Sequence, residues 1–224
     1  MANESELKPG YSIDLVMCID ATKSMSPIID EVKANALSFH KKIADRIESD
    51  PYKHLKQLRV KVIYFRDYAF DEEPMVESPF FCLGESGEDE KFSEFVNGIK
   101  ATGGGDAPED ALEALALAMR SDWADADLMR HIIIMFTDTT AHMFTNADKP
   151  GYPPNMPKSF AELEELWEGP EMNHNAKRLV LLAPDCSPWT KMYNWKKTLY
   201  IASKAGCGCE LDIDTVSHCV LLCC

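Results

Sequence analysis

Basic side chains are scarce in this 224-residue chain: 23 Lys and Arg stand against 37 Asp and Glu, which gives a formal net charge of −14. No stretch is basic enough to neutralise a row of phosphates, which argues against nucleic acid and anionic membranes as partners. A long apolar run is also missing, since no segment approaches the ~20 residues that span a bilayer. The acidic balance suits a cation ligand or a basic protein partner, and it serves plain solubility equally well.

The first twelve residues, MANESELKPGYS, have neither an apolar core nor a basic start. Because a secretory signal peptide needs both, we expect a cytoplasmic protein whose eight cysteines are reduced. Five of these cysteines crowd residues 207–224 beside His218, spaced as C-x-C, nine residues, then C-x3-C-C. This spacing matches no common zinc motif, so we expect free thiols there as well.

Strand and helix patterns alternate along the chain, with no linker or internal repeat. Short apolar runs predict buried strands at 12–20, 59–66, within 75–83, at 131–136, 178–183 and 209–213. Helical spacing predicts helices from Ser26-Pro27 to Asp50-Pro51, at 91–99, 107–121, 160–167 and 189–205, and from Asp214 onward. The alternation predicts an α/β fold: a doubly wound, mostly parallel central sheet of about six strands with helices on both faces. We expect a single domain over 1–224, with its core in 11–224 and an N-terminal tail at 1–10.

Oxygen-bearing side chains follow two of these strands at their carboxyl ends, where α/β sheets bind ligands. Asp20 ends the first strand, and Thr22 and Ser24 follow it in the pattern D-x-T-x-S. Asp138 follows the strand at 131–136. Carboxylates and hydroxyls are the ligands of a hard divalent cation. The sequence therefore predicts a metal site at this edge of the sheet.

Three glycines, 103–105, precede Asp106 in a loop before the clearest helix. Without side chains they allow the backbone to turn tightly beneath a bound ion. The loop lacks the Gly-Lys-Ser/Thr ending of a phosphate-binding loop, and no strand leads directly into it as a dinucleotide fingerprint requires.

These motifs together resemble the metal-ion-dependent adhesion site (MIDAS) of the von Willebrand factor type A family, over residues 11–205. The segments ATGGGDAPEDALEAL, SDW and IIIMFTD are most similar to the type A domain of alpha-type protein kinases and their bacterial relatives, although no kinase domain is present. The resemblance implies that Asp20, Thr22, Ser24 and Asp138 hold Mg2+, Mn2+ or Ca2+. It also implies that a carboxylate of a partner protein completes the coordination.

The chain departs from the family pattern at the family's Thr position. Asp106 stands at the matching distance from the following helix, and Thr102 lies four residues earlier, so either one fills that position. Asp67, after the second strand, ends on the same edge and is expected to ligate the ion or to accept hydrogen bonds near it.

Simpler interpretations exist for single residues. Ser24 or Ser26 could cap a helix, and Asp106 with Glu109 fits a capping box. We expect His142 to pack or hydrogen-bond in its loop rather than to ligate, and residues 71–73 to form a solvated loop.

Three functions remain open: metal-dependent protein binding, an enzyme that uses Asp20 for Mg2+-dependent phosphotransfer or hydrolysis, and a scaffold with a structural metal. The phosphotransfer pattern D-x-D is absent, and no Ser-His-Asp or Cys-His set is convincingly spaced. We therefore expect a binding module and no enzyme.

Overall fold

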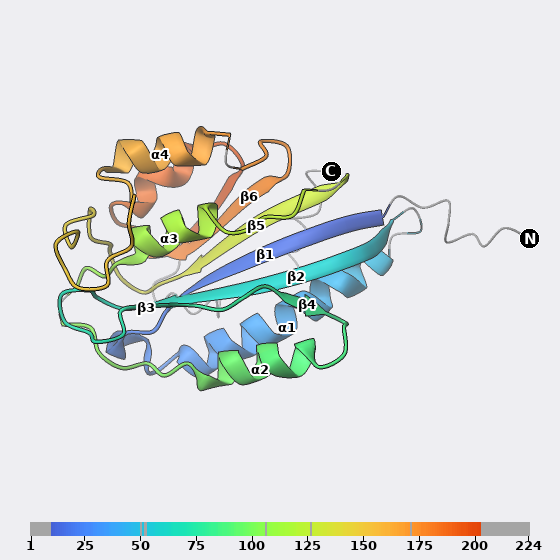
Figure 1. The fold of residues 1–224 in the computed structure, drawn as a ribbon, viewed down its shortest axis with the longest axis horizontal. Coiled ribbons are helices and arrows are strands. Elements are labelled where there is room, and N and C mark those ends of the chain that lie inside the picture. Colours follow the sequence, from blue (N-terminus) through green and yellow to red (C-terminus); the bar gives the residue numbers. More distant parts are fainter. Residues whose placement is uncertain are drawn as a thin grey trace, which may run out of the picture.

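The computed structural model describes residues 10–49, 51, 53–105, 107–125, 127–170 and 172–202. Within these residues one central sheet of seven strands forms the middle layer (Figure 1). The strands are β1 (Gly10–Asp20), β2 (His54–Phe65), β3 (Met75–Glu77), β4 (Phe81–Leu83), β5 (Met129–Phe136), β6 (Lys177–Ala183) and β7 (Thr198–Ala202). Their order across the sheet is β3-β2-β1-β5-β6-β7, and β4 also pairs with β2. The sheet is parallel except where the two short strands β3 and β4 run antiparallel to β2.

Helices cover both faces of the sheet, as Figure 1 shows. One face carries α1 (Ile29–Glu48) and α2 (Glu88–Gly98), and the other carries α3 (Ala111–Met119) and α4 (Phe160–Glu168). Each face has its own apolar cluster, one packed against α1 and α2 and the other against α3 and α4. The predicted doubly wound, mostly parallel α/β fold is confirmed.

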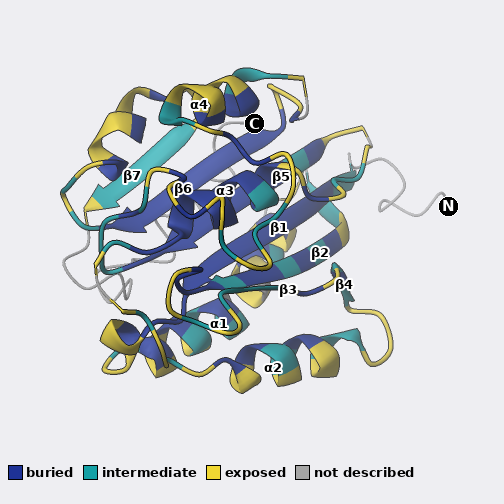
Figure 2. Ribbon diagram, turned by 60° about the vertical axis from the view of Figure 1, so that its left-hand side comes forward, coloured by how far each residue is buried: buried dark blue, intermediate teal, exposed yellow. Residues whose placement is uncertain are grey.

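Strand β1 is buried on both sides, which explains its nearly continuous apolar sequence. Ile13, Leu15 and Met17 point into the cluster under α1 and α2, whereas Val16 and Cys18 point into the cluster under α3 and α4. Figure 2 shows the inner strands as buried and the outer sides of the helices as exposed. The residues at the carboxyl end of β1 are therefore carried by a strand that is buried from Ser12 to Asp20.

The helix predicted over residues 189–205 is wrong. A 3-10 helix, Trp189–Asn194, is followed by strand β7, which pairs in parallel with β6. Trp189, Met192 and Trp195 are all buried, and their spacing of three fits a 3-10 turn as well as an α-helix. Lys197 then takes a φ of +64°, and the Thr-Leu-Tyr-Ile segment that follows suits an edge strand. Pairing with the free edge of β6 determined that this segment forms a strand, and the local sequence pattern could not show that pairing.

Other bounds shift by a few residues. The helix expected from Ser26 begins at Ile29, after a 3-10 turn at Lys23–Met25, and the single strand expected within 75–83 is divided into β3 and β4. The strand predicted at 209–213 and the helix predicted from Asp214 lie outside the described residues.

Three of the eight cysteines fall in the described part of the chain, and all three are free thiols: Cys18, Cys82 and Cys186. Burial raises the pKa of the Cys18 thiol far above its usual range, so it stays protonated. The crowded cysteines at 207–224 lie outside the described residues. Among the residues described, no helix combines the length and the apolar character needed to cross a bilayer.

Candidate metal site

The carboxyl ends of the two central strands lie side by side. Strands β1 and β5 are parallel neighbours, with Ile19 opposite Phe136, so the residues that follow them meet at one edge of the sheet. The Thr137 hydroxyl donates a 2.8 Å hydrogen bond to Asp20 Oδ2 across this junction. The parallel register of β1 and β5 therefore brings the two segments together, as predicted.

The D-x-T-x-S loop folds back on itself through its own side chains. Asp20 Oδ1 accepts hydrogen bonds from the backbone N–H of Thr22 at 3.0 Å and from its hydroxyl at 2.6 Å. Thr22 Oγ1 lies 3.0 Å from Ser24 Oγ, and Ser24 Oγ donates to Asp138 Oδ1 at 3.0 Å. Four of the predicted ligands, Asp20, Thr22, Ser24 and Asp138, therefore belong to one connected set of oxygen atoms.

Burial disfavours the ionised form of the two carboxylates in this set of oxygen atoms. Asp20 is fully buried, and desolvation raises its pKa to about 6, although hydrogen bonds from Thr22 and Thr137 stabilise the charged form. Burial also raises the pKa of Asp138. A divalent cation would offset this cost directly, because it supplies positive charge next to both carboxylates.

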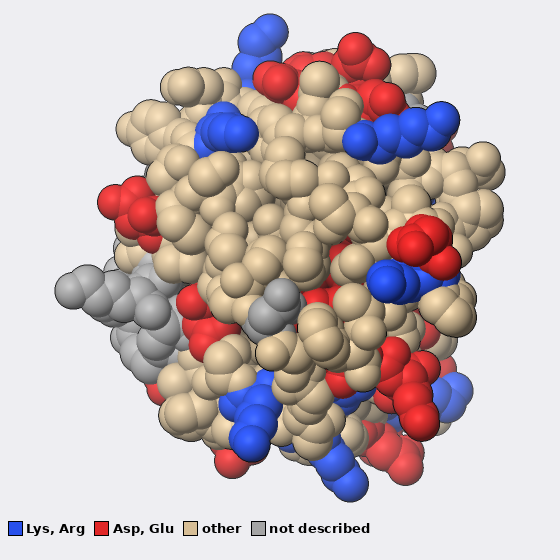
Figure 3. Space-filling view, turned by 90° about the vertical axis from the view of Figure 1, so that its left-hand side faces the viewer, with Lys and Arg blue, Asp and Glu red and all other residues tan. Residues whose placement is uncertain are grey.

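A cavity of about 270 Å³ opens beside these residues. It is lined by Thr22, Lys23, Ser24, residues 103–105, Ala107, Glu109, Asp138 and Thr139. Figure 3 looks onto this edge of the molecule: acidic atoms show near the middle of a largely uncharged surface, and Lys and Arg lie toward its margin. Ser24 is exposed and Asp138 is half-buried at this edge, whereas Asp20 and Thr22 lie buried behind them.

Glu109 is a site residue that the sequence interpretation missed. It is 3% exposed and lines the same cavity, and its Oε2 atom has no hydrogen-bond partner among the described residues. A Cβ atom placed on Gly104 would lie 2.9 Å from Glu109 Oε1 and 3.1 Å from Thr22 Cβ, so the carboxyl packs close to the D-x-T-x-S loop. Burial and the charges of Asp20 and other acids raise its pKa to about 9.

The sequence interpretation had assigned Glu109 to a capping box with Asp106 and therefore not to the metal site. In the structure Asp110 is the N-cap of α3, and its side chain makes no capping bond. The Glu109 N–H donates to Thr140 O at 3.2 Å, and its carbonyl accepts from the His142 N–H at 2.8 Å. These contacts hold the Glu109 backbone against the loop after β5 and turn its side chain inward. The helix was predicted to begin at residue 107, and it begins only at Ala111.

Asp71 was predicted to lie in a solvated loop, and that prediction is wrong. The Asp71 side chain instead supports the glycine turn. Its Oδ2 atom accepts the N–H of Gly104 at 2.9 Å and the N–H of Asp67 at 3.2 Å. A Cβ on Gly103, whose φ is +70°, would lie 1.7 Å from Asp71 Oδ1. Gly103 is therefore required both for its backbone conformation and for this close approach.

Backbone contacts join the glycine loop to the D-x-T-x-S loop. Lys23 N–H donates to Gly103 O at 3.2 Å, and Thr102 N–H donates to Ala21 O at 2.9 Å. The buried Arg66 guanidinium donates to Ala21 O at 3.2 Å and to Lys100 O at 3.1 Å. The two loops are held as one unit, so the oxygens keep their positions without help from a partner.

The remaining predicted residues fall in different places. Thr102 has an exposed side chain and is not among the residues that line the cavity. Asp106 lies outside the described residues. Asp67 is fully buried and contacts His142 and Asn146, not Asp20. His142 hydrogen-bonds as expected: its Nδ1 atom lies 3.4 Å from Thr145 Oγ1 in its own loop, and its Nε2 atom lies 3.2 Å from Asp67 Oδ2 in the loop after β2.

Replacing Glu109 by Gln is expected to weaken Mn2+ binding about 10–100-fold, the range found when groups that support a metal site are lost. The change keeps the shape of the side chain and removes its ability to ionise beside a bound cation. Asp106→Ala is expected to act similarly if Asp106 fills the family's Thr position. Calorimetric titration of Mn2+ measures both variants.

Thr102→Val is the matched control, because it removes a hydroxyl that the structure places outside the cavity. Its Mn2+ affinity is expected to equal that of the wild type. A large loss for Thr102→Val, with none for Glu109→Gln and Asp106→Ala, would assign the position to Thr102.

Comparison with known proteins gives a fold and no family. No family model and no curated protein matches the sequence. The pilus adhesin SpaC from Lactobacillus rhamnosus GG shares the fold with a TM-score of 0.61 at 10% identity, over 94% of this chain and 30% of the adhesin. Proximal thread matrix protein 1 from the mussel byssus, solved with a zinc-occupied MIDAS motif, gives 0.54 at 12% identity, over 97% of this chain and 47% of that protein.

This chain thus spans less than half of either neighbour. Identities this low establish the fold alone, which is an α/β fold of the von Willebrand A and Rossmann-like kind.

Proposed function

We propose that this chain is a metal-dependent protein-binding module of the von Willebrand factor A type. A divalent cation is held at the carboxyl edge of the sheet, and a carboxylate of a partner protein completes its coordination. The observation that carries the proposal is the 3.0 Å hydrogen bond between Ser24 and Asp138. It joins the oxygen atoms of two segments that are distant in the sequence, and both residues line an open cavity.

The donor set supports Mg2+ as the cation, with Mn2+ or Ca2+ as substitutes. Asp20 and Asp138 supply carboxylates, Thr22 and Ser24 supply hydroxyls, and the unpartnered Glu109 oxygen faces the same cavity. Hard cations bind such oxygens and retain waters in the positions that the protein leaves open.

A partner carboxylate fits that open position. In a half-enclosed cavity a carboxylate gains more from a divalent ion than from an exposed salt bridge, because solvent screens the charges less. The structural neighbours agree with this use, since one is a pilus adhesin and the other has a MIDAS motif occupied by zinc.

A binding role is proposed over a phosphotransfer enzyme because the chain has D-A-T at Asp20, where the phosphotransfer pattern needs D-x-D. The resemblance to the type A domain of alpha-type kinases and the expected cytoplasmic location remain predictions.

A pull-down from the source cells with the immobilised chain tests the proposal. Capture of a partner is expected with Mg2+, is lost with EDTA, and returns when Mg2+ is added in excess. Ser24→Ala removes one hydroxyl of the site and is expected to reduce capture, whereas Ser93→Ala, in α2 and away from the site, leaves it unchanged.

A second arm tests the chemistry of the partner. Amidation of the carboxylates in the cell extract is expected to abolish capture, while acetylation of its lysines leaves capture intact. The same proteins retained in EDTA and by Ser24→Ala would contradict the proposal.

A further inference from the structure

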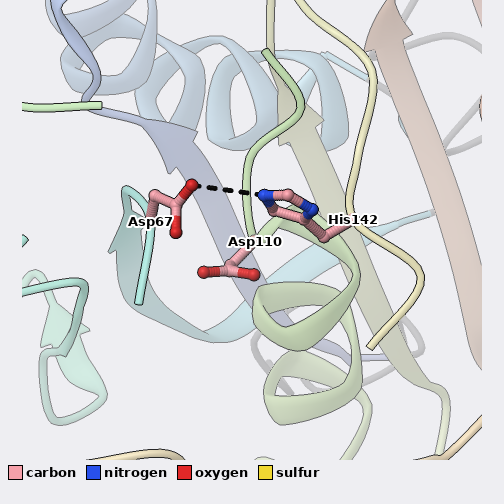
Figure 4. A group of neighbouring side chains, drawn as sticks. All are labelled: Asp67, Asp110 and His142. Atoms are coloured by element: carbon pink, nitrogen blue, oxygen red, sulfur yellow. Dashed lines mark hydrogen bonds and ion pairs between the residues drawn. The ribbon is translucent and has the colours of Figure 1, made fainter. Parts of the chain in front are cut away.

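A second group of potential ligands lies in the described part of the chain, made of Asp67, Asp110 and His142. The three side chains come from the loop after β2, the start of α3 and the loop after β5, and they converge in Figure 4. One ligand atom from each lies within 4.8 Å of the others. None of the three belongs to the D-x-T-x-S set.

Both carboxylates are fully buried, which makes the group costly unless it is neutralised. Asp67 Oδ2 contacts His142 Nε2 at 3.2 Å, and the Asn146 amide donates to Asp67 Oδ1 at 3.2 Å and to Asp110 Oδ1 at 2.9 Å. The backbone N–H of Tyr68 donates to Asp110 Oδ2 at 2.5 Å. These bonds fix the positions of the carboxylates, and the imidazole faces them.

Two further acids next to this group lack partners for one oxygen each. Glu113 is fully buried one turn after Asp110, with Oε1 bonded to the Tyr152 hydroxyl at 2.9 Å and Oε2 unpaired among the described residues. Burial, then the charge of Asp110, raises the pKa of Glu113 to about 8, and Asp67 adds to this effect. Glu109, on the other side of Asp110 in the chain, also has an unpaired buried oxygen and also senses Asp67 and Asp110.

Two fully buried carboxylates, Asp67 and Asp110, thus face one imidazole in this group. Glu109 and Glu113 beside Asp110 each leave one buried oxygen without a partner among the described residues. Buried unpaired oxygens of this kind call for a physical explanation, and a cation bound in the group would supply positive charge beside them.

We propose that Asp67, Asp110 and His142 form a second metal site, separate from the D-x-T-x-S site, which binds Zn2+ or a similar transition-metal ion. An imidazole ligand favours such ions over Mg2+ and Ca2+, which prefer oxygen alone. Two carboxylates with one imidazole give three protein ligands, and a fourth position stays open for water. The first site has oxygen ligands only, so the imidazole of His142 distinguishes the second site from it.

Zinc titration of the 224-residue chain tests this site. The variant Asp20→Asn serves as the background, because Zn2+ also competes for oxygen sites. In that background His142→Gln is expected to weaken the binding of one Zn2+ at least about 10-fold. His174→Gln, which removes an exposed imidazole outside the group, is expected to change nothing. The cysteines at 207–224 are the same in all variants, so their contribution cancels in the comparison.

Anomalous scattering from crystals of the wild-type chain grown with Zn2+ gives an answer that does not depend on whether a variant folds. A zinc peak bounded by Asp67, Asp110 and His142 is expected. Equal Zn2+ affinity and stoichiometry in His142→Gln and His174→Gln, or zinc peaks only elsewhere, would overturn the proposal. Loss of Mn2+ binding at Asp20 would leave it intact, so the two sites are tested separately.

Discussion

Asp20→Asn is expected to weaken Mn2+ binding at least about 100-fold, because groups that merely support metal ligands already contribute about 10–100-fold. Asn keeps the shape of the side chain and retains one oxygen acceptor for Thr22 or Thr137. The variant therefore removes the negative charge at the centre of the oxygen set and leaves most of its packing in place. Calorimetric titration of Mn2+ at about neutral pH measures the loss, because Asp20, whose pKa is about 6, is then ionised.

Asp30→Asn is the matched control, since the Asp30 side chain is almost fully exposed in α1. It removes one unit of negative charge without touching the site, so its Mn2+ affinity is expected to stay within about 2-fold of the wild type, the scale of a screened surface charge. Anomalous scattering from Mn2+-soaked crystals should place the ion among Asp20, Thr22, Ser24 and Asp138. Unchanged affinity in Asp20→Asn, or a peak at another position, would remove the basis for the proposed function.

In EDTA the protein is expected to lose stability as the pH rises from about 5 to about 9. Burial raises the pKa of Asp20 to about 6, of Glu113 to about 8 and of Glu109 to about 9. The folded state thus holds protons that the unfolded state has already released above about pH 4.5. Stability is complete below that pH and falls as each folded pKa is passed, since folding then requires buried charge.

Thermal unfolding at pH 5.5 and pH 8, about the two ends of this titration range, measures the effect. A chain of this size is expected to lose about 2–4 °C in Tm for each kcal/mol lost. Excess Mg2+ should recover part of the loss at the higher pH by taking over the role of the protons. Glu113→Gln should flatten the pH profile, and Glu164→Gln, at an exposed position of α4, should not. A Tm that rises steadily with pH in EDTA would contradict this account.

Local patterns in the sequence were sufficient for the fold and for half of the site. Apolar runs located the buried strands β1, β5 and β6, because a strand enclosed on both faces needs apolar residues at nearly every position. Asp20 and Asp138 could be placed at one edge because parallel strands end together. Local patterns failed at residues 189–205, where a spacing of three fits two kinds of helix and the pairing of β7 with β6 decides the outcome.

The other half of the site depends on contacts between residues distant in sequence. Glu109 faces the metal cavity because the loop after β5 holds its backbone and Gly104 leaves room for its carboxyl. Asp71 approaches Gly103 from a loop more than thirty positions earlier in the chain. The burial of Asp67 and Asp110 beside His142 likewise arises where three segments meet. Sequence spacing determined which oxygens follow the strands, and tertiary packing decided which acids are buried, because burial depends on contacts between segments that are distant in the sequence.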